Sequence, residues 1–363
     1  MDKLNVLIVD DSVVYRRILV TAVERTAMAA SIQAASNGVL ALERMQQASY
    51  DVVLLDVNMP EMDGIEALRR MKATYPKIQV IMISSTGGKN AAITLETLQL
   101  GAMDFIVKPL DNDFESNMVF VQQQLQILFG QVIIDKLNPL KQTSDRLFSK
   151  ESESNPPMKE QITKTHITGI DLVVVAASTG GPVALEKLLT GLSHEFLTPI
   201  LVVQHMPPDF TKVFAENLDK KCSMKVFEGK EDDILRAGQI IIAPGGYHMY
   251  MKKLEGSIKK IGLNSGDFVN GVRPAADILF QSVAKEYAGA RILAIVLTGM
   301  GTDGRDGVVA LKKACRCYCI AQSEASCVVF GMPGSVVGAK LSDEVLDIDR
   351  IAHRMLEIRN NGS

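Results

Sequence analysis

Residues 173–182 read VVVAASTGGP, and this stretch indicates how the second half of the chain folds. The run of small and branched apolar residues has the composition of a buried strand. It ends at a serine and a threonine followed by two glycines and a proline, a composition typical of a tight turn that leads into a helix. The stretch therefore predicts a strand, a turn and a helix, which is the repeating unit of an α/β fold.

The same alternation continues on both sides of this stretch. From residue 170 almost to the carboxyl terminus, strands are expected in DLVVVAA, PILVVQH, QIIIAPG, RILAIVLTG and CYCIAQS, with helices such as PVALEKLLTGL between them. The first 108 residues alternate in the same way, from NVLIVDD to DFIVKPL. Strands that alternate with helices indicate parallel sheets, and continuously apolar strands are covered on both faces. We expect two doubly wound α/β domains, the second of them Rossmann-like.

A polar segment separates the two halves. Residues 141–166, KQTSDRLFSKESESNPPMKEQITKTH, are mixed in charge and have no apolar face that would repay their ordering entropy. The chain of 363 residues is also too long for one compact core. We therefore predict a first domain at 1–130, a linker at 131–167 and a second domain at 168–363.

The composition is that of an ordinary soluble globular protein, with 47% hydrophobic residues, 22% charged residues and a formal net charge of −3. No basic excess favours nucleic acid as a partner. No segment approaches the roughly 18 uninterrupted apolar residues of a membrane span, so we expect no membrane insertion. The first residues, MDKLNVLIVDDS, lack the basic start and the length of an export signal. We expect a cytoplasmic protein.

The five cysteines are an odd number confined to the second half, and this is a poor basis for a disulfide framework. Cys315, Cys317 and Cys319 would lie on one face of a strand if the strand began as early as Cys315, and three thiols can in principle hold a metal. Their two-residue spacing differs from the C-x-x-C of zinc sites. Small buried residues are the favoured interpretation.

Polar and charged side chains end four strands of the first half. Asp10 and Asp11 follow the first strand, Asp56 ends the third, Ser84 ends the fourth and Lys108 follows the fifth. Because ligands of open parallel sheets bind beyond the carboxyl ends of the strands, these groups converge on one rim. Neighbouring carboxylates repel unless a hard cation lies between them, and oxygen ligands suit Mg²⁺. A lone Asp pair is usually a solvated turn, but four such strand ends predict a magnesium site.

The motifs VDDS at 9–12, LLDVNMPEMDG at 54–64, SS at 84–85 and VKP at 107–109 resemble the response-regulator receiver domain over about residues 4–130. The resemblance implies a flavodoxin-like fold in which Asp56 accepts a phosphoryl group from a histidine kinase. It implies that Mg²⁺ is held by Asp10, Asp11, Asp56 and, through its main-chain carbonyl, Asn58. It also implies that Lys108 pairs with the phosphate and that Ser84 and Phe105 shift on phosphorylation. The domain would then regulate whatever follows it.

Three interpretations compete for the turn in VVVAASTGGP: tight geometry alone, a phosphate site at the helix amino terminus, or a catalytic nucleophile. A dinucleotide site expects an acidic residue about 20 positions later, at the end of the next strand. The sequence has Gln204 and His205 there. This difference weakens the nucleotide-binding interpretation.

A catalytic interpretation needs a base for Ser178 and an orienting group for that base. His205 ends the next strand, and Asp303 lies just beyond another strand end, in LAIVLTGMGTDG. Each residue alone has an ordinary explanation: a cap, a loop histidine, the first turn of a helix. Together, at the carboxyl ends of three strands, they favour catalysis. The motif is not G-x-S-x-G, and the order Ser, His, Asp disfavours an α/β-hydrolase.

The motifs AASTGGP, VVQHMPPDF, IAPGGYHM, LTGMGTDGRDG and IAQSEASCVVFGMP resemble the methylesterase domain of the chemotaxis CheB family, over about residues 170–358. The resemblance implies hydrolysis of glutamate methyl esters on chemoreceptor cytoplasmic domains and, in many members, deamidation of receptor glutamines, without a cofactor for the esterase reaction. Ser178 would attack the ester, His205 would move its proton and Asp303 would orient His205. Main-chain amides of Met300 and Thr179 would hold the oxyanion.

Two residues or runs depart from the family pattern. Ala176 stands where the family usually has glycine, and a C-R-C-Y run precedes IAQS. His248 in APGGYHM is a weaker candidate, more often structural, and is left out of the predicted chemistry.

We therefore predict a methylesterase gated by phosphorylation, in which the unphosphorylated first domain covers the Ser178 rim. Two rivals remain at this point. One is an adaptor without catalysis that binds receptors when phosphorylated, and the other is a nucleotide-binding output domain.

Overall fold

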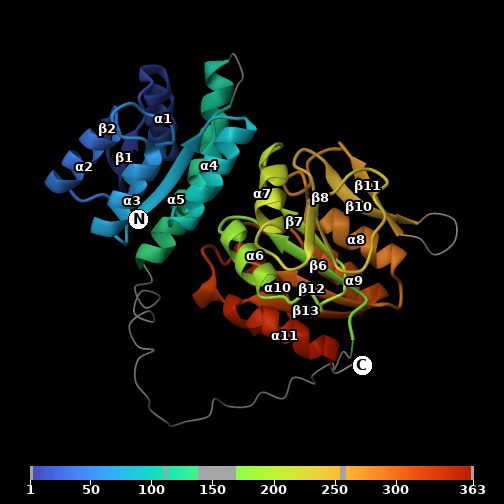
Figure 1. Ribbon diagram of the computed structural model, residues 1–363. Helices are drawn as coiled ribbons and strands as arrows, with labels where there is room; N and C mark the ends of the chain where they lie inside the picture. Colours follow the sequence, from blue (N-terminus) through green and yellow to red (C-terminus); the bar gives the residue numbers. More distant parts are fainter. Residues whose placement is uncertain (1–2, 110–112, 138–168, 254–258, 361–363) are drawn as a thin grey trace, which may run out of the picture. The chain divides into compact units, whose positions relative to one another are not determined.

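The computed structural model describes residues 3–109, 113–137, 169–253 and 259–360. The chain divides into two compact units, Met1–Ile162 and Thr163–Ser363. Figure 1 labels the elements of both units. None of the described helices combines the length and the apolar character needed to cross a bilayer.

The first unit is a five-stranded parallel sheet between helices. Its strands have the order β2-β1-β3-β4-β5. Helix α1 packs against α5, while α3 contacts both α2 and α4, so helices cover both faces. The elements are β1 (Leu4–Val9), α1 (Val13–Thr26), β2 (Ala29–Ala35), α2 (Gly38–Gln47), β3 (Val52–Asp56), α3 (Gly64–Thr74), β4 (Gln79–Ser84), α4 (Gly88–Gln99), β5 (Asp104–Val107) and α5 (Phe114–Leu137).

Short polar side chains begin three of these helices directly after the strands. Ser12, Asn37 and Asp63 accept hydrogen bonds from the backbone N–H groups three residues later, at 3.3, 2.9 and 2.9 Å. Such caps satisfy amides that have no partner within the helix. The caps fix where each loop ends, and the loops carry the polar residues of the rim.

The domain boundary expected after residue 130 falls inside α5. This helix continues to Leu137, and its buried side chains recur at helical spacing as far as Val132. The apolar face that packs against α1 therefore extends past the expected boundary, and we propose that the first domain ends at Leu137. The rest of the expected linker, 138–167, lies outside the described residues.

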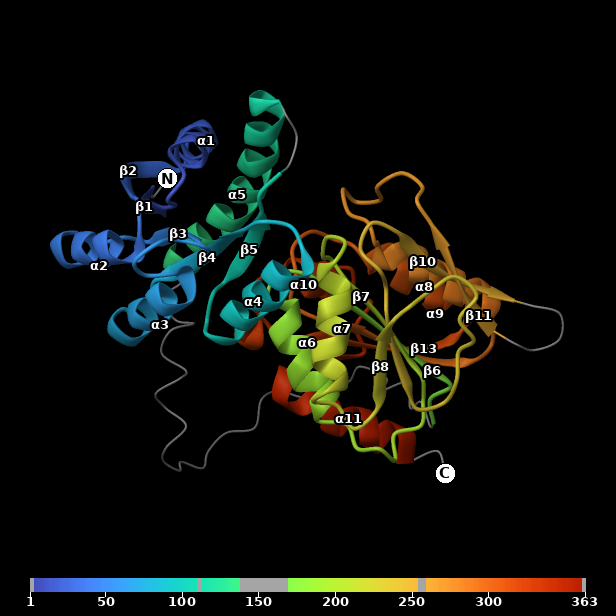
Figure 2. The same ribbon diagram turned by 45° about the horizontal axis from the view of Figure 1, so that its top comes forward.

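The second unit is built on a seven-stranded parallel sheet with the order β14-β13-β12-β6-β7-β9-β8. The elements of this sheet and its helices are β6 (Leu172–Ala177), α6 (Gly181–Thr190), β7 (Ile200–Gln204), α7 (Phe210–Asp219), β8 (Lys225–Glu228), β9 (Gln239–Ile242), α8 (Ala276–Glu286), β12 (Arg291–Val296), α9 (Arg305–Ala314), β13 (Arg316–Gln322), α10 (Gly331–Gly338), β14 (Glu344–Leu346) and α11 (Ile348–Asn360). Helices α6, α7 and α11 lie on one side of the sheet and α8 and α9 on the other, as Figure 2 shows. The expected doubly wound α/β architecture is confirmed in both units.

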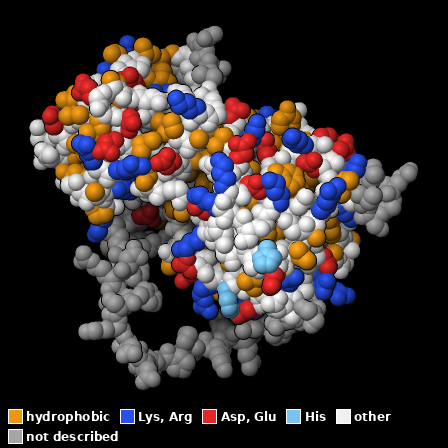
Figure 3. Space-filling view, in the orientation of Figure 1, with side chains coloured by type: hydrophobic (Ala, Val, Ile, Leu, Met, Phe, Trp, Pro, Cys, Tyr) orange, Lys and Arg blue, Asp and Glu red, His pale blue; other side chains and the backbone are white. Residues whose placement is uncertain are grey.

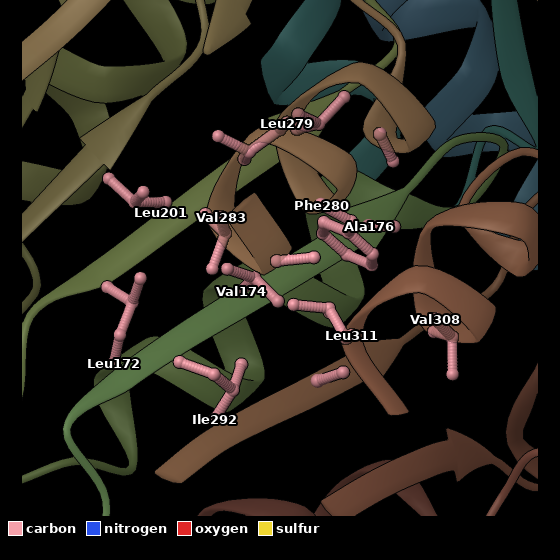
Figure 4. Packing of buried hydrophobic residues seen from close by; sticks show 14 of the residues in the cluster. Leu172, Val174, Ala176, Leu201, Leu279, Phe280, Val283, Ile292, Val308 and Leu311 are labelled. Atoms are coloured by element: carbon pink, nitrogen blue, oxygen red, sulfur yellow. The ribbon is translucent and has the colours of Figure 1, made fainter. Parts of the chain in front are cut away.

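The chain first runs from β6 to β7 on one side and later returns to β12 on the other side of β6. This reversal creates a topological switch point beside β6, where open α/β sheets usually bind their ligands. The central strand is buried along its whole length. Figure 4 shows Leu172, Val174 and Ala176 of β6 packed beneath α8. The rigid core thus holds the turn after β6 in place.

The sequence did not predict four strands of this unit. They are β8, β14 and the antiparallel hairpin of β10 (His248–Lys253) and β11 (Lys259–Asn264). Strands β8 and β14 have only four and three residues and lie at the two sheet edges, so their apolar signal is weak. The hairpin is a separate two-stranded sheet that packs against α8 and does not extend the seven-stranded sheet.

Basic and acidic side chains alternate over the surface that Figure 3 shows, without a broad area of one sign. This agrees with the small net charge of −3.

Candidate active site

The two glycines after β6 are needed for two different structural reasons. Residues 178–181 form a turn in which the Gly181 N–H donates to the Ser178 carbonyl oxygen at 2.7 Å. Gly180 has φ +73° and ψ −5°, the conformation of the third residue of a type II turn, which favours glycine. At Gly181, a Cβ atom would lie 2.0 Å from Oε1 of Gln204. The sequence TGGP therefore forms a tight turn, and the buried Gln204 side chain packs directly against it.

Ser178 is held by its backbone at the carboxyl end of β6. Its N–H donates to the Thr298 carbonyl oxygen at 3.0 Å. A Cβ at Gly299 would lie 2.7 Å from Ser178 Cβ, so only glycine allows this strand end to approach so closely. The Ser178 side chain is half-buried, and within the described parts of the chain its hydroxyl makes no hydrogen bond. The hydroxyl is therefore available at the rim.

His205 and Asp303 form the contact that the sequence predicted. His205 Nε2 lies 2.8 Å from Asp303 Oδ2, and the two side chains are 10% and 2% exposed. The His205 N–H donates to the Ala177 carbonyl oxygen at 3.1 Å, which places His205 beside Ser178 at the same sheet edge. Because Nε2 contacts the carboxylate, Nδ1 is the ring nitrogen that Asp303 leaves unengaged.

The carboxylate of Asp303 is fully engaged. Besides His205, it accepts the N–H groups of Ala276 at 2.6 Å and Asp277 at 3.1 Å, at the start of α8, and the Asn270 side-chain amide at 3.1 Å. Burial works to raise its pKa, but the hydrogen bonds from His205 and the two backbone amides outweigh burial and hold the pKa below its usual value. Asp303 therefore stays ionised and fixed in orientation.

The two amides expected to stabilise an oxyanion lie close to Ser178. Thr179 follows it in the turn, and Met300 follows Gly299, where an added Cβ would lie 2.7 Å from Ser178 Cβ. Neither N–H donates to any residue that the structure describes. Free N–H groups beside a nucleophile can bind the negative oxygen that forms when a carbonyl is attacked.

A second cluster lies at the carboxyl ends of the strands in the first unit. Carboxylate oxygens of Asp10, Asp11 and Asp56 all lie within 4.8 Å of one another. The Lys108 ammonium lies 2.8 Å from Asp10 Oδ2 and 2.9 Å from Asp56 Oδ1. Apart from this ammonium, Asp10 Oδ2 is buried without a hydrogen-bond donor among the described residues. The single Lys108 ammonium therefore pairs with two buried carboxylates, and the exposed carboxylate of Asp11 lies beside them.

The charges of this acidic cluster are poorly balanced. Burial raises the pKa of Asp56 to about 6, and the charge of Asp10 adds to the rise although Lys108 opposes it. Burial works to lower the pKa of Lys108, but the two carboxylates outweigh it and raise the pKa. The site therefore favours an added positive charge.

The remaining predicted residues of the first unit lie around this cluster. Ser84 is buried at the end of β4, where its hydroxyl accepts a hydrogen bond from Thr94 Oγ1 at 2.6 Å. Phe105 is half-buried on β5. Asn58 follows Asp56 by two residues, and its side chain donates to Asn90 at 3.4 Å. Ser84 and Asn58 thus lie at or just after the carboxyl ends of β4 and β3, while Phe105 lies near the start of β5.

Comparison with known proteins identifies both halves. The profile of the CheB methylesterase family matches residues 173–355, and the profile of the response regulator receiver domain matches residues 6–118. A protein-glutamate methylesterase/protein-glutamine glutaminase of Trichodesmium erythraeum is 37% identical over 98% of this chain and 99% of its own length. The chain belongs to the CheB methylesterase family.

Other members agree over most of the chain. A protein-glutamate methylesterase/protein-glutamine glutaminase 2 of Caulobacter vibrioides is 38% identical, covering 96% of each chain. The crystal structure of the Thermotoga maritima CheB methylesterase catalytic domain matches with a TM-score of 0.50 and 37% identity, over 53% of this chain and all of that domain. The predicted family, the fold class and the assignment as a hydrolase that carries a receiver domain are confirmed.

Two residues of the CheB-type site were not singled out from the sequence. The Asn270 side-chain nitrogen donates to Asp303 Oδ1 and, at 2.9 Å, to Asp277 Oδ2. Asp277 Oδ1 in turn accepts the N–H groups of Gly304 and Gly307 at the start of α9. The carboxylates of Asp303 and Asp277, bridged by Asn270, therefore connect the start of α8 to the start of α9. Burial raises the pKa of Asp277, and the charge of Asp303 adds to the rise.

A sequence signal for Asn270 existed. Asn270 and Gly271 stand between two valines, have φ +54° and +75°, and are closed by two hydrogen bonds between Val269 and Val272. Asn-Gly between apolar residues is the strongest short-range signal for such a turn. What the turn faces could not be predicted, because Asp277 and Asp303 reach it through tertiary packing.

In the receiver, Arg16 was also missed. One guanidinium nitrogen donates to the carbonyl oxygens of Asp10 and Asp11, at 2.6 and 2.9 Å. This side chain fixes the loop that carries both carboxylates. An arginine six residues after Asp10 has no distinctive pattern in a single sequence.

His248 and the cysteines have structural surroundings. His248 is 1% exposed, and both ring nitrogens contact backbone groups, the Asp267 carbonyl oxygen at 2.9 Å and the Ala275 N–H at 3.1 Å. Cys317 and Cys319 lie in the hydrophobic core, and burial raises the pKa of Cys317 to about 12. Among the described residues, the acidic cluster of the receiver is the only place where ligand atoms of three or more His, Cys, Asp or Glu residues lie within 4.8 Å of one another. These surroundings agree with the interpretation as small buried residues for Cys317 and Cys319, while Cys315 is only half-buried and precedes β13.

Proposed function

We propose that this CheB family member hydrolyses glutamate methyl esters on the cytoplasmic domains of chemoreceptors, and that Ser178, His205 and Asp303 carry the reaction. The observation that supports this most is the 2.8 Å contact between His205 and Asp303 at the sheet edge that also presents Ser178. A nucleophile, a base and an orienting carboxylate are the groups that ester hydrolysis through an acyl-enzyme requires.

In the first half-reaction, Ser178 Oγ attacks the ester carbonyl carbon while His205 Nδ1 takes the hydroxyl proton. Asp303 stabilises the imidazolium through Nε2. The carbonyl oxygen becomes negative and accepts hydrogen bonds from the amides of Met300 and Thr179. When this intermediate collapses, the C–O bond to the methoxy group breaks, His205 returns its proton to that oxygen, and methanol leaves.

In the second half-reaction, water takes the place of methanol. His205 removes a proton from the water, whose oxygen attacks the acyl carbon. The proton then returns to Ser178 Oγ, and the receptor glutamate is released as a free carboxylic acid. The same residues acting on a glutamine side chain would release ammonia, so deamidation is part of this proposal and needs no cofactor.

The receiver domain would control this reaction through phosphorylation of Asp56 by a histidine kinase. The acidic cluster fits Mg²⁺, because its three carboxylates converge and, apart from the Lys108 ammonium, the buried Asp10 Oδ2 has no hydrogen-bond donor among the described residues. Asp10, Asp11, Asp56 and the Asn58 carbonyl would hold the ion, which neutralises charge during phosphoryl transfer. Lys108 would contact the phosphate, and Ser84 and Phe105 would respond to it. That the unphosphorylated receiver covers the Ser178 rim remains a prediction.

The location that this proposal implies is the cytoplasm, where the receptor domains and the kinase would be reached. It requires neither nucleic acid nor membrane insertion.

The test is release of methanol from a methylated receptor cytoplasmic fragment, with the full-length chain and with or without acetyl phosphate as phosphodonor. We expect turnover that rises with the phosphodonor and falls by at least about 10³-fold in Ser178→Ala. Binding of the variant to the receptor fragment is the control for folding. A Ser178→Ala variant that keeps both binding and its effect on receptor methylation would favour an adaptor and overturn the proposal.

A further inference from the structure

Gln204 connects the backbone of the proposed nucleophile to that of the proposed base. It is the last residue of β7, its side chain is 2% exposed, and none of the steps above uses it. Its Nε2 donates to the Ser178 carbonyl oxygen at 3.0 Å and to the His205 carbonyl oxygen at 3.2 Å. Because both neighbours are acceptors, the nitrogen end of the amide must face them.

The other end of the same amide has no partner. Gln204 Oε1 is buried and accepts no hydrogen bond from any residue that the structure describes. It lies behind Gly181, where a Cβ atom would come within 2.0 Å of it. A buried acceptor without a donor destabilises the fold, whereas a methionine of similar length would not carry this cost. Stability alone therefore does not account for a glutamine here, and such exceptions concentrate at functional sites.

The hydrogen bond to Ser178 sets the direction of a particular N–H group. In a trans peptide the carbonyl and the following N–H point in opposite directions. The Ser178 carbonyl points inward, to Gly181 N at 2.7 Å and to Gln204 Nε2. The Thr179 N–H of the same peptide must then point outward, and it donates to no described residue.

We infer that Gln204 is a positioning residue of the esterase site, which holds the Ser178–Thr179 peptide so that the Thr179 N–H faces the oxyanion. By also binding the His205 carbonyl oxygen, it fixes the spacing between the strand ends that carry Ser178 and His205. This inference rests on the proposed function, because an oxyanion forms only if Ser178 attacks a carbonyl.

The test compares Gln204→Met with the parent in the methanol-release assay. Methionine fills the same space but donates to neither carbonyl. We expect kcat to fall roughly 10- to 100-fold, less than complete removal of an oxyanion donor. KM should change by less than about threefold, because an oxyanion contact exists only in the transition state. The unfolding temperature should stay within about 4 °C of the parent or rise.

Gln239→Met is the matched control. Gln239 is the first residue of β9, so it lies at the amino ends of the parallel strands, whereas Gln204 lies at their carboxyl ends. Its Oε1 is also buried without a donor among the described residues. If the effect comes only from replacing a buried amide, both variants should behave alike. We expect Gln239→Met to keep the parent kcat.

The possible outcomes distinguish the positioning role of Gln204 from the proposed esterase function. An inactive Ser178→Ala together with a Gln204→Met variant of parental kcat would overturn the role of Gln204 and leave the proposed function intact. An active Ser178→Ala would overturn the proposed function itself. A fall in kcat accompanied by a large drop in unfolding temperature, or equalled by Gln239→Met, would show a structural role only and also overturn the inference.

Discussion

The acidic cluster of the receiver and the Ser178 rim occupy the same place in two similar folds, yet they treat buried charge in opposite ways. At the rim, Asp303 accepts four hydrogen bonds, and its pKa lies below the usual value. In the receiver, Asp56 shares one ammonium with Asp10, and burial raises its pKa to about 6. The donors around Asp303 balance its buried charge, while the receiver cluster favours an added cation.

This difference suits two kinds of task. A catalytic site gains from groups that are already oriented, since no reorganisation is then needed during reaction. A switch gains from a site whose charge balance changes when an ion or a phosphoryl group arrives, because that change can bias two conformations. This contrast can be tested by substituting Asp303, whose carboxylate is fully hydrogen-bonded, Asp56, whose carboxylate is not, and Asn270, whose amide bridges two carboxylates.

The largest effect is expected from Asp303→Asn. The amide nitrogen cannot accept from His205 or from the start of α8, so the imidazole loses its orientation and its charge partner. We expect kcat for methanol release to fall by about 10³- to 10⁴-fold. Receptor-fragment binding should be kept. Activity within tenfold of the parent would show that the His205–Asp303 contact is not part of the mechanism.

An intermediate effect is expected from Asp56→Asn, which should abolish activation by acetyl phosphate and leave the basal methanol-release rate within about twofold. The matched control is Asp51→Asn at the amino end of β3, which should keep the response to the phosphodonor. Activation of Asp56→Asn to the parental extent would place the phosphorylation site elsewhere.

Asp56→Asn should also change stability in a pH-dependent way. The folded-state pKa of Asp56, about 6, is above the ordinary value of 3.8, so the neutral carboxyl is the form that favours folding. Its contribution is fully present below about pH 4 and is lost as the pH rises through 6. The variant, which is neutral throughout, should unfold at a higher temperature than the parent above pH 6 and at a similar temperature near pH 4. Calorimetry without Mg²⁺ measures this difference, and an unchanged difference from pH 4 to 7 would contradict it.

The smallest effect is expected from Asn270→Gly. Glycine keeps the left-handed backbone at φ +54° but removes the amide that bridges Asp277 and Asp303. Asp303 retains three of its donors, so we expect kcat to fall only about three- to tenfold. Lys340→Gly, at φ +55° after α10, is a control for the backbone change and should not affect kcat. Equal effects of the two substitutions would show that the Asn270 amide is not involved.

The positions of most candidate site residues could be predicted from the sequence, because these residues lie at strand ends. Ser178, His205, Asp10 and Asp56 each end or follow an apolar run, and parallel strands bring such positions to one edge. Short edge strands such as β8, with weak apolar signals, were missed. The boundary at residue 130 fell inside α5, because a helix that packs on α1 can run past the last strand signal.

The sequence by itself determined the α/β architecture, the family and the residues at the strand ends, because hydrophobic periodicity and motif spacing are local properties of the chain. Only the tertiary structure decided which ring nitrogen of His205 meets Asp303, that Asn270 bridges two carboxylates, and that Gln204 binds the carbonyls of Ser178 and His205. These contacts join residues from neighbouring strands and loops. Their geometry depends on side-chain orientation and packing, which no spacing along the chain specifies.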